Sequence, residues 1–406
     1  MLLAAMSASG QLCVPQALIP SVRSLRVGIA DAFGMPPVAR LGSDDVIRIS
    51  FDEIAEASSR LRVRFIHQNA DRRKSDLFDH EFMRGFNDIE ITDIARSVDT
   101  RTHYYNYRLD LPADGSLLTA SGNYLAEIFR EDDPSQVIAR VPFSLSEQSV
   151  QLSGSATTRT DCGANSRWQQ VAFGATIPQE ALVDPFSTLR AILARDTQAP
   201  ELNLGAPSAR TISGIEYSHR PNLIFDAGNE WRRFEITDLH TPGMRVDSLR
   251  DDDAMPHAWI SLDEPRAYGS YEPDRTQYGR YLPRRSGSSD ADISADYIMT
   301  HFTLAMPEQP DAEVLLQGEF MLPYPREAAV MTYDRTLRAY TLAVPLKQGA
   351  YNYRYALRRS GTDADPAPIE GDFYETSNQF NIRLFMRRPG SRADRLLGAI
   401  TIISNP

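Results

Sequence analysis

The feature that most constrains the fold is a series of short runs in which apolar or aromatic residues alternate with polar ones. One run, LKQGAYNYRY at residues 346–355, places Tyr351, Tyr353 and Tyr355 at every second position. Successive side chains of a β-strand point to opposite faces of a sheet, so the three tyrosines are predicted to share one face. A binding face and a half-buried sheet would both produce this pattern.

Similar runs recur along the whole chain and are bounded by Gly, Pro, Asp or Asn, which predicts an all-β protein. A chain of 406 residues is too long for one hydrophobic core and is expected to form three domains. We expect tandem immunoglobulin-like, early-set β-sandwich domains. The predicted division is a signal-like or disordered N-terminus at 1–21, an N-terminal β-sandwich at 22–147, a middle β-sandwich at 148–294 with a long surface loop at 263–292, and a C-terminal immunoglobulin-like early-set β-sandwich at 295–406.

Composition and charge exclude several classes of function. Hydrophobic residues make up 42% of the chain, which is ordinary for a folded globular protein. The formal net charge of −11 argues against nucleic acid as a partner, because binding to phosphates needs a basic surface. No run of about 18 apolar residues is present, so no helix is expected to span a membrane.

The N-terminus, MLLAAMSASGQLC, resembles the end of a secretory signal with a cleavage site at residues 8–10. The basic segment that normally begins such a signal is missing, so a truncated signal and an ordinary disordered terminus both remain open. Leu12 precedes Cys13 where a lipoprotein signal has a small residue, so lipidation is not favoured. Two cysteines, Cys13 and Cys162, do not make a disulfide framework, and no bridge between them is expected.

The familiar catalytic and metal motifs are missing from the sequence. The seven histidines form neither an H-E-x-x-H pair nor a site with C-x-x-C, so no metal and no cofactor are predicted. Nucleophile-elbow, phosphate-loop and dinucleotide motifs are not found either. The acidic run IEGDFYETSN contains Glu370, Asp372 and Glu375, which could in principle supply an acid and base pair, but acidic residues in a turn are usually solvated or capping.

A carbohydrate-binding reading rests on the order LLQGEF, VMTYD and YTLAVPLKQGAYNYRY at residues 315–355. This order resembles the glycogen-binding-like modules of the early-set immunoglobulin class, in which exposed tryptophans stack on sugar rings. Trp168, Trp231 and Trp259 all lie outside this block, so the resemblance extends to the fold and not to sugar binding. The tyrosines are then expected to pack on the core, with their hydroxyls at a wet edge.

Three groups of motifs in series resemble one family. They are ISFDEI with RVRFIHQNADR, SVDTRTHYYNYRLDLP and SGNYLAEIF; then FDAGNEWRRFE; and finally LKQGAYNYRY with IEGDFYETSNQFNIRLFMRRPGSRADRLLG. This pattern is similar to that of the type IX secretion system plug proteins of Bacteroidota, formerly a domain of unknown function. Gln68 stands where that family often has Cys and Arg72 where it often has Trp, so the loop after residue 68 is expected to be arranged differently.

The resemblance implies a non-enzymatic protein of the periplasm, peripherally associated with the outer membrane. It would seat against the periplasmic mouth of the outer-membrane translocon barrel, its protein partner, and close it, as a monomer within a hetero-complex. The loop at 263–292 is rich in Tyr and Arg, which are common at interface hot spots. The candidate partner contacts in it are Tyr268, Tyr271, Arg275, Tyr278, Arg280 and Tyr281, with a merely solvated loop as the alternative. A carbohydrate-binding protein and a hydrolase with carboxylates converging only in three dimensions remain as rivals.

Overall fold

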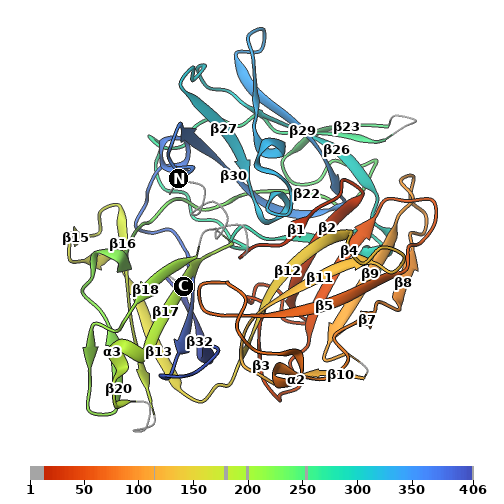
Figure 1. The fold of residues 1–406 in the computed structure, drawn as a ribbon. Coiled ribbons are helices and arrows are strands. Elements are labelled where there is room, and N and C mark those ends of the chain that lie inside the picture. The colour runs from red at the N-terminus through yellow and green to blue at the C-terminus, as the bar shows by residue number, and fades with distance from the viewer. Residues whose placement is uncertain (1–12, 114, 178–181, 198–200, 252–254, 405–406) are drawn as a thin grey trace.

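The computed structural model describes residues 13–113, 115–177, 182–197, 201–251 and 255–404 (Figure 1). The predicted signal at 1–12 lies outside these ranges. The all-β expectation is confirmed, since strands arranged in mainly antiparallel sheets build every domain and helices are limited to single turns. Within the described ranges, no helix is long and apolar enough to cross a bilayer.

The N-terminal domain consists of two main sheets that enclose one core. One sheet has the order β1-β12-β11-β5-β7 with β3 beside β12, and the other has the order β2-β4-β9-β8. The core contains inward residues of both sheets, such as Phe51 and Tyr107 from one and Tyr124 and Phe143 from the other. The elements are β1 (Gln16–Ala17), β2 (Val22–Ile29), β3 (Val38–Arg40), β4 (Ile47–Glu53), β5 (Leu61–Gln68), α2 (Asp79–Phe82), β6 (Met83–Gly85), β7 (Ile89–Glu90), β8 (Asp93–Arg96), β9 (Tyr105–Leu111), β10 (Ser116–Leu118), β11 (Gly122–Arg130) and β12 (Val137–Ser146).

The middle domain combines strands from two distant parts of the chain. Its sheets have the orders β13-β16-β20-β19, with β21 beside β16, and β18-β17-β31-β32. Phe173 and Tyr217 of the first sheet and Phe380 and Ile382 of the second share one core. The elements are β13 (Gln151–Thr157), β14 (Arg159–Thr160), β15 (Gly163–Ala164), β16 (Trp168–Thr176), α3 (Pro185–Thr188), β17 (Leu189–Arg195), β18 (Leu202–Gly205), β19 (Ala209–Arg210), β20 (Gly214–Tyr217), η2 (Pro221–Leu223), β21 (Ile224–Asp226), β31 (Gln379–Met386) and β32 (Arg395–Ile403).

The third domain is inserted between β21 and β31, and we call it the inserted domain. Strand β30 pairs with β22, β25 and β27, and faces a second sheet of order β23-β24-β26-β29-β28. The elements are β22 (Arg232–Ile236), β23 (Val246–Arg250), β24 (His257–Ile260), β25 (Tyr281–Pro283), α4 (Ala291–Ser294), β26 (Tyr297–Leu304), β27 (Ala312–Gln317), η3 (Glu319–Met321), η4 (Arg326–Ala329), β28 (Thr332–Asp334), β29 (Ala339–Lys347), β30 (Gly349–Arg359) and α5 (Ala367–Glu370).

These pairings differ from the expected boundary between 294 and 295. Residues 189–195 of β17 pair with residues 380–386 of β31, so the end of the chain returns to the middle sandwich. The inserted domain in turn begins with β22, within the block predicted to belong to the middle sandwich. The reason is that alternation within a strand indicates which face is buried but not which distant strand supplies the hydrogen bonds.

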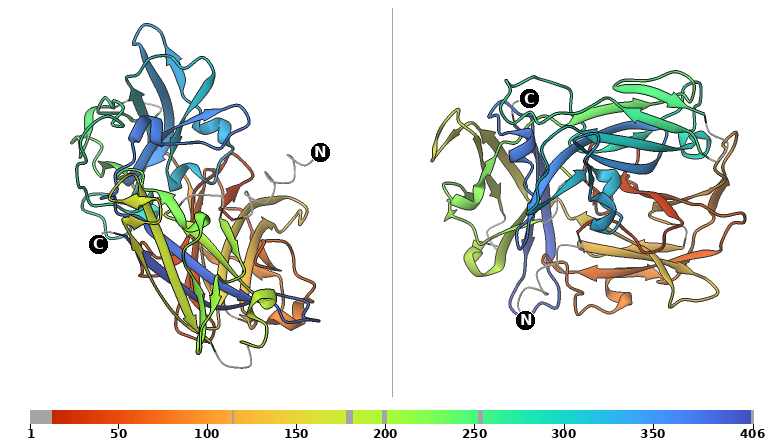
Figure 2. Two further views of the ribbon diagram at one scale, coloured as in Figure 1. Left: turned by 90° about the vertical axis from the view of Figure 1, so that its left-hand side faces the viewer. Right: turned by 90° about the horizontal axis from the view of Figure 1, so that it is seen from above.

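The three domains pack around a common centre. Figure 1 places the inserted domain above the other two, with the middle domain on the left and the N-terminal domain on the right, and the left view of Figure 2 again shows the inserted domain on top. Strands β31 and β32 of the middle domain run along the N-terminal domain, where β12 contacts β32. The inserted domain contacts the N-terminal domain through Lys347 and Asp52 and the middle domain through Arg280 and Gln379, so each domain touches the other two.

Candidate interaction surface and domain junctions

The loop at 263–292 presents only part of its predicted contact residues to solvent. Tyr268 is 98% exposed, whereas Arg280 and Tyr281 are buried at 7% and 3% exposure. Arg275 is exposed, and Tyr271 and Tyr278 are half-buried. Arg280 and Tyr281 are thus parts of the interior, while the other four predicted residues lie where a partner could reach them.

The buried end of this loop joins domains to each other. The guanidinium of Arg280 donates to Gln379 Oε1 of β31 at 2.7 Å, and the ring of Tyr281 stacks on Tyr351 at 5.2 Å. Tyr271 donates to Glu230 Oε1 at 2.8 Å, and burial together with that carboxylate raises the pKa of Tyr271. The loop is therefore anchored at Tyr271 and again at Arg280 and Tyr281. Arg275 is exposed between these anchors, and Tyr268 is exposed just before the first of them.

The tyrosines of β30 form part of the interior. The side chains of Tyr351, Tyr353 and Tyr355 are at most 2% exposed, and the residues on the opposite face of the strand are buried as well. Tyr353 and Tyr355 each donate to Asp263 Oδ2 at 2.8 Å. The hydroxyls of Tyr353 and Tyr355 thus bond a buried carboxylate and do not reach the solvent-exposed edge that the sequence predicted. The reason is that β30 pairs with β22, β25 and β27 inside the inserted domain.

The same carboxylate belongs to a charge network in which Arg232 contacts two acids. Arg232 bonds Asp263 Oδ1 at 2.7 Å and Glu370 Oε1 at 3.0 Å, and all three side chains are buried. Burial by itself would raise the pKa of Glu370, but Arg232 and Arg266 lower it. Glu370 is therefore a structural anion. Asp372 instead accepts from the backbone N–H of Gly228 at 2.9 Å, and the two acids serve different partners.

A second buried charge cluster joins the N-terminal and inserted domains. Lys347 Nζ at the end of β29 donates to Asp52 Oδ2 of β4 at 2.7 Å, and both side chains are at most 1% exposed. Tyr297 donates to the same oxygen at 2.6 Å, and the ammonium of Lys347 lies 4.2 Å from the centre of the Tyr104 ring. A buried ion pair specifies one geometry, because any displacement leaves a charge without compensation.

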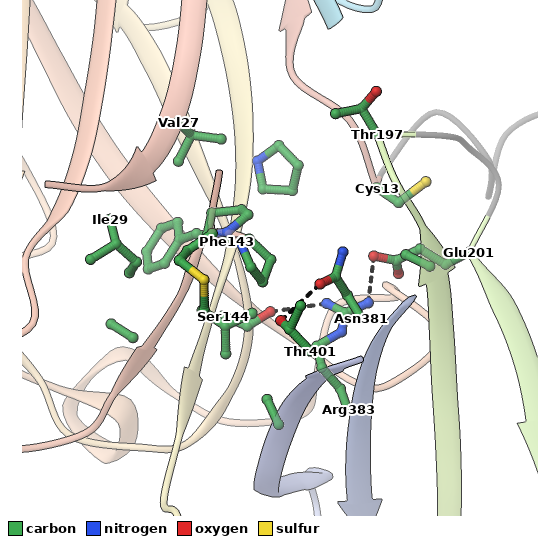
Figure 3. A pocket seen from close by; sticks show the side chains of 18 of the residues that line it. Cys13, Val27, Ile29, Phe143, Ser144, Thr197, Glu201, Asn381, Arg383 and Thr401 are labelled. Carbon is green, nitrogen blue, oxygen red and sulfur yellow. Dashed lines mark hydrogen bonds and ion pairs between the residues drawn. The ribbon is translucent and has the colours of Figure 1, made fainter. Parts of the chain in front are cut away.

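A third cluster joins the N-terminal and middle domains at a cavity of about 480 Å³, shown in Figure 3. Val27, Ile29 and Phe143 form an apolar wall, and Asn381, Arg383 and Thr401 face it from β31 and β32. Cys13 and Glu201 lie at its far side in Figure 3.

Glu201 is the acid that holds this junction. Arg72 of the N-terminal domain donates to it from Nη2 at 2.8 Å, and Arg383 of β31 forms an ion pair with it. Burial would raise the pKa of Glu201, but Arg383 and Arg72 lower it to about 2. Arg383 also donates to Asn123 Oδ1 at 3.1 Å and to Ser144 Oγ at 3.0 Å, both in the N-terminal domain.

No reactive constellation emerges from these clusters in the described ranges. The acids have arginine, lysine or backbone partners, and no group of three or more His, Cys, Asp and Glu residues lies close enough to hold a metal ion. Cys13 and Cys162 are not joined by a disulfide. The arrangement provides a stiff body with a projecting loop.

Comparison with known proteins identifies the family of this chain. Residues 22–147 match the family described as "Type 9 secretion system plug protein 1st domain", which is the N-terminal domain of the structure. A crystal structure of a hypothetical protein from Parabacteroides merdae ATCC 43184 shares 34% identity, covers 97% of this chain and 99% of its own, and superposes with a TM-score of 0.93. The chain belongs to the type 9 secretion system plug protein family.

Other comparisons add little to the plug family assignment. A membrane-anchored protein from Corynebacterium diphtheriae has 8% identity over 94% of this chain and 92% of its own, with a TM-score of 0.15, which carries no argument about fold. No protein of curated function matches the chain. The family resemblance inferred from the motifs is thus confirmed, and plug proteins are components of secretion systems and are not known as enzymes.

Sequence reasoning missed the residues that join the domains of this plug family member. Asp52 and Lys347 lie within quoted motifs, but they are 295 positions apart and nothing in the sequence pairs them. From the sequence, Arg72 is predicted only to alter the arrangement of the loop after residue 68. A charged residue inside an otherwise alternating apolar strand, as Asp52 is in ISFDEI, was the available signal.

Proposed function

We propose that this protein is a non-enzymatic plug that seats on the periplasmic mouth of the outer-membrane translocon barrel of the type IX secretion system and closes it. A wide water-filled barrel passes small solutes unless a body occupies its opening. The family assignment supports a role in the secretion machinery. The protein would work in the periplasm, peripherally associated with the outer membrane, as one copy within a hetero-complex.

The observation that carries the proposal is the set of buried and largely buried ion pairs at the domain junctions. Asp52 with Lys347 joins the N-terminal and inserted domains, and Glu201 with Arg72 and Arg383 joins the N-terminal and middle domains. A protein that closes a pore has to keep its shape while it is bound there. These contacts fix the three sandwiches relative to each other.

The exposed part of the loop at 263–292 is the proposed contact with the barrel. Tyr268, which is 98% exposed, and the exposed Arg275 are residue types enriched at interface hot spots, and both belong to a loop that is anchored at Tyr271 and Arg280. Carbohydrate binding, the alternative, receives no comparable support, because the ring of Trp259 is already in contact with other side chains. It stacks on His301 at 4.6 Å, and the Arg250 guanidinium lies 5.1 Å from its centre.

The experiment is affinity purification of the tagged full-length protein from outer membranes in mild detergent, with the barrel identified by mass spectrometry. We expect the barrel to co-purify with the wild type. The substitution Tyr268→Ser should weaken this recovery on the order of tenfold, as for a hot-spot residue. Ile212→Ser is the matched control, because Ile212 is 96% exposed on the middle domain and lies outside the loop.

The outcomes separate the two parts of the proposal. A wild-type protein recovered only free in the periplasm would contradict the plug function. Co-purification that Tyr268→Ser and Ile212→Ser leave equally intact would keep the plug and move the contact away from this loop. A strain without the protein should also take up a small fluorescent solute faster than a strain that has it.

A further inference from the structure

Four side chains form a compact group on the outer face of the inserted domain. Strands β24 and β26 run parallel, with His257 opposite Met299 and Trp259 opposite His301. All four residues are half-buried, while their neighbours Ala258, Ile298 and Thr300 point to the interior. The group is therefore a square of outward side chains, with the two histidines at one pair of diagonal corners and Met299 and Trp259 at the other.

The two histidines direct ring nitrogens at each other across this square. His257 Nδ1 and His301 Nε2 are 2.8 Å apart. One of these nitrogens has to act as the acceptor, so at least one ring is neutral at this contact.

A metal ion requires only a small change in this geometry. Metal–imidazole bonds of about 2.0 Å set two nitrogens about 3.3 to 4.0 Å apart for tetrahedral to linear coordination. Side-chain rotations that widen the present contact by about 0.5 to 1.2 Å would thus admit an ion between the rings. The histidines lie on the half-exposed face of the sheet, where such rotations disturb little of the core.

The remaining residues of the group select the type of ion. Met299 lies directly across from His257 and two positions from His301 on the same strand, so its side chain starts from the same face of the sheet as both imidazoles. Thioether and imidazole together favour Cu(I) among the common metals. The Trp259 ring lies parallel to His301 at 4.6 Å and offers a π-face to a cation. The nearby Arg250 disfavours a dication more than a monovalent ion.

We propose that His257, His301 and Met299 bind one Cu(I) ion beside Trp259. The site is independent of the proposed plug function, because it lies on the outer face of the β23-β24-β26-β29-β28 sheet and uses none of the loop residues. A periplasmic secretion component with such a site would carry copper or respond to it.

The test is an anaerobic titration of the purified full-length protein with Cu(I), in competition with a chromophoric Cu(I) chelator. We expect one Cu(I) to be withdrawn from the chelator per chain, with quenching of tryptophan fluorescence that is lost in Trp259→Phe. His301→Gln and His257→Gln should each weaken binding on the order of 100-fold, and Met299→Leu about tenfold. His240→Gln is the control, since His240 is exposed in a different loop.

Two results would overturn the proposal. One is a Cu(I) affinity of the wild type equal to that of the His257→Gln, His301→Gln double variant. The other is equal loss of affinity with His240→Gln, which would indicate scattered surface binding. Thermal melting of each variant without copper confirms that the fold is retained, so a loss of affinity reports on the site itself.

Discussion

At the scale of single residues, Arg72 shows how one side chain can join two domains. Its φ of +64° places it in the left-handed region within the loop after β5. Its guanidinium contacts Glu201 from Nε at 3.2 Å and from Nη2 at 2.8 Å. A planar, two-point contact of this kind is specific to arginine, and through it Arg72 holds the N-terminal and middle domains together.

The Glu201 carboxylate makes this junction sensitive to acid. Its folded pKa of about 2 lies below the ordinary value of 4.5, so its contribution to stability is complete above pH 4.5 and is lost as the pH falls toward 2. The contribution is on the order of 3 kcal/mol. We expect Glu201→Gln to lower the free energy of unfolding at pH 7 and to flatten its decline below pH 4.5, measured by urea unfolding at several pH values.

The control for this prediction is Glu327→Gln, which alters an exposed pair with Arg326 and should leave the profile unchanged. A wild-type profile that Glu201→Gln does not alter between pH 4.5 and pH 2 would contradict the assignment of Glu201 as the acid-sensitive group.

At the scale of elements, the loop at 263–292 depends on close packing at Gly279. This glycine has φ +84°, and a Cβ built on it would lie 2.4 Å from Thr197 Oγ1 and 2.8 Å from Trp231 Cζ2. Trp231 itself donates to Asp196 Oδ2 at 3.2 Å, so the contact joins the loop to the middle domain. Only glycine can adopt this backbone conformation without placing a Cβ atom too close to Thr197 and Trp231.

Gly279→Ala should therefore destabilise the protein by about 1 to 3 kcal/mol and loosen the loop. The measurement is thermal unfolding together with hydrogen exchange of residues 268–281, which should accelerate. Gly269→Ala, in the same loop with its nearest neighbour atom at 3.4 Å and without positive φ, is the matched control. Equal stability and exchange in both variants would show that the loop is not anchored at Gly279.

At the scale of the whole molecule, the inserted domain interrupts the middle domain, and charged contacts join both to the N-terminal domain. The middle sandwich is complete only after β31 and β32 have returned to β17, and Lys347 reaches Asp52 across a junction. Cooperative unfolding of all three domains follows from such shared contacts.

We expect one calorimetric transition for the wild type. Lys347→Met leaves Asp52 buried without its cation and should cost about 3 to 5 kcal/mol, whereas the double variant with Asp52→Asn should recover much of this loss. Differential scanning calorimetry distinguishes these cases. Separate melting of the inserted domain in the wild type would mean that the junctions do not couple the domains, and would weaken the argument for a stiff plug.

The sequence by itself determined the local structure and the family. Alternation in runs such as ISFDEI and LKQGAYNYRY reports directly on strand and face, because a pleated backbone repeats every two residues. The ordered motifs identified the plug family, and the composition of the loop at 263–292 predicted a surface segment. Tyr268 and Arg275 of this loop are exposed, whereas Arg280 and Tyr281 are not.

Only the tertiary structure decided which distant residues meet. It brought β31 to β17, placed Arg280 and Tyr281 in the interior, directed Tyr353 and Tyr355 to Asp263, and set His257 against His301. These outcomes depend on pairing between strands far apart in the chain and on the charges buried where domains meet. Local periodicity carries no information about either, because a strand buries its apolar face equally well against many partners.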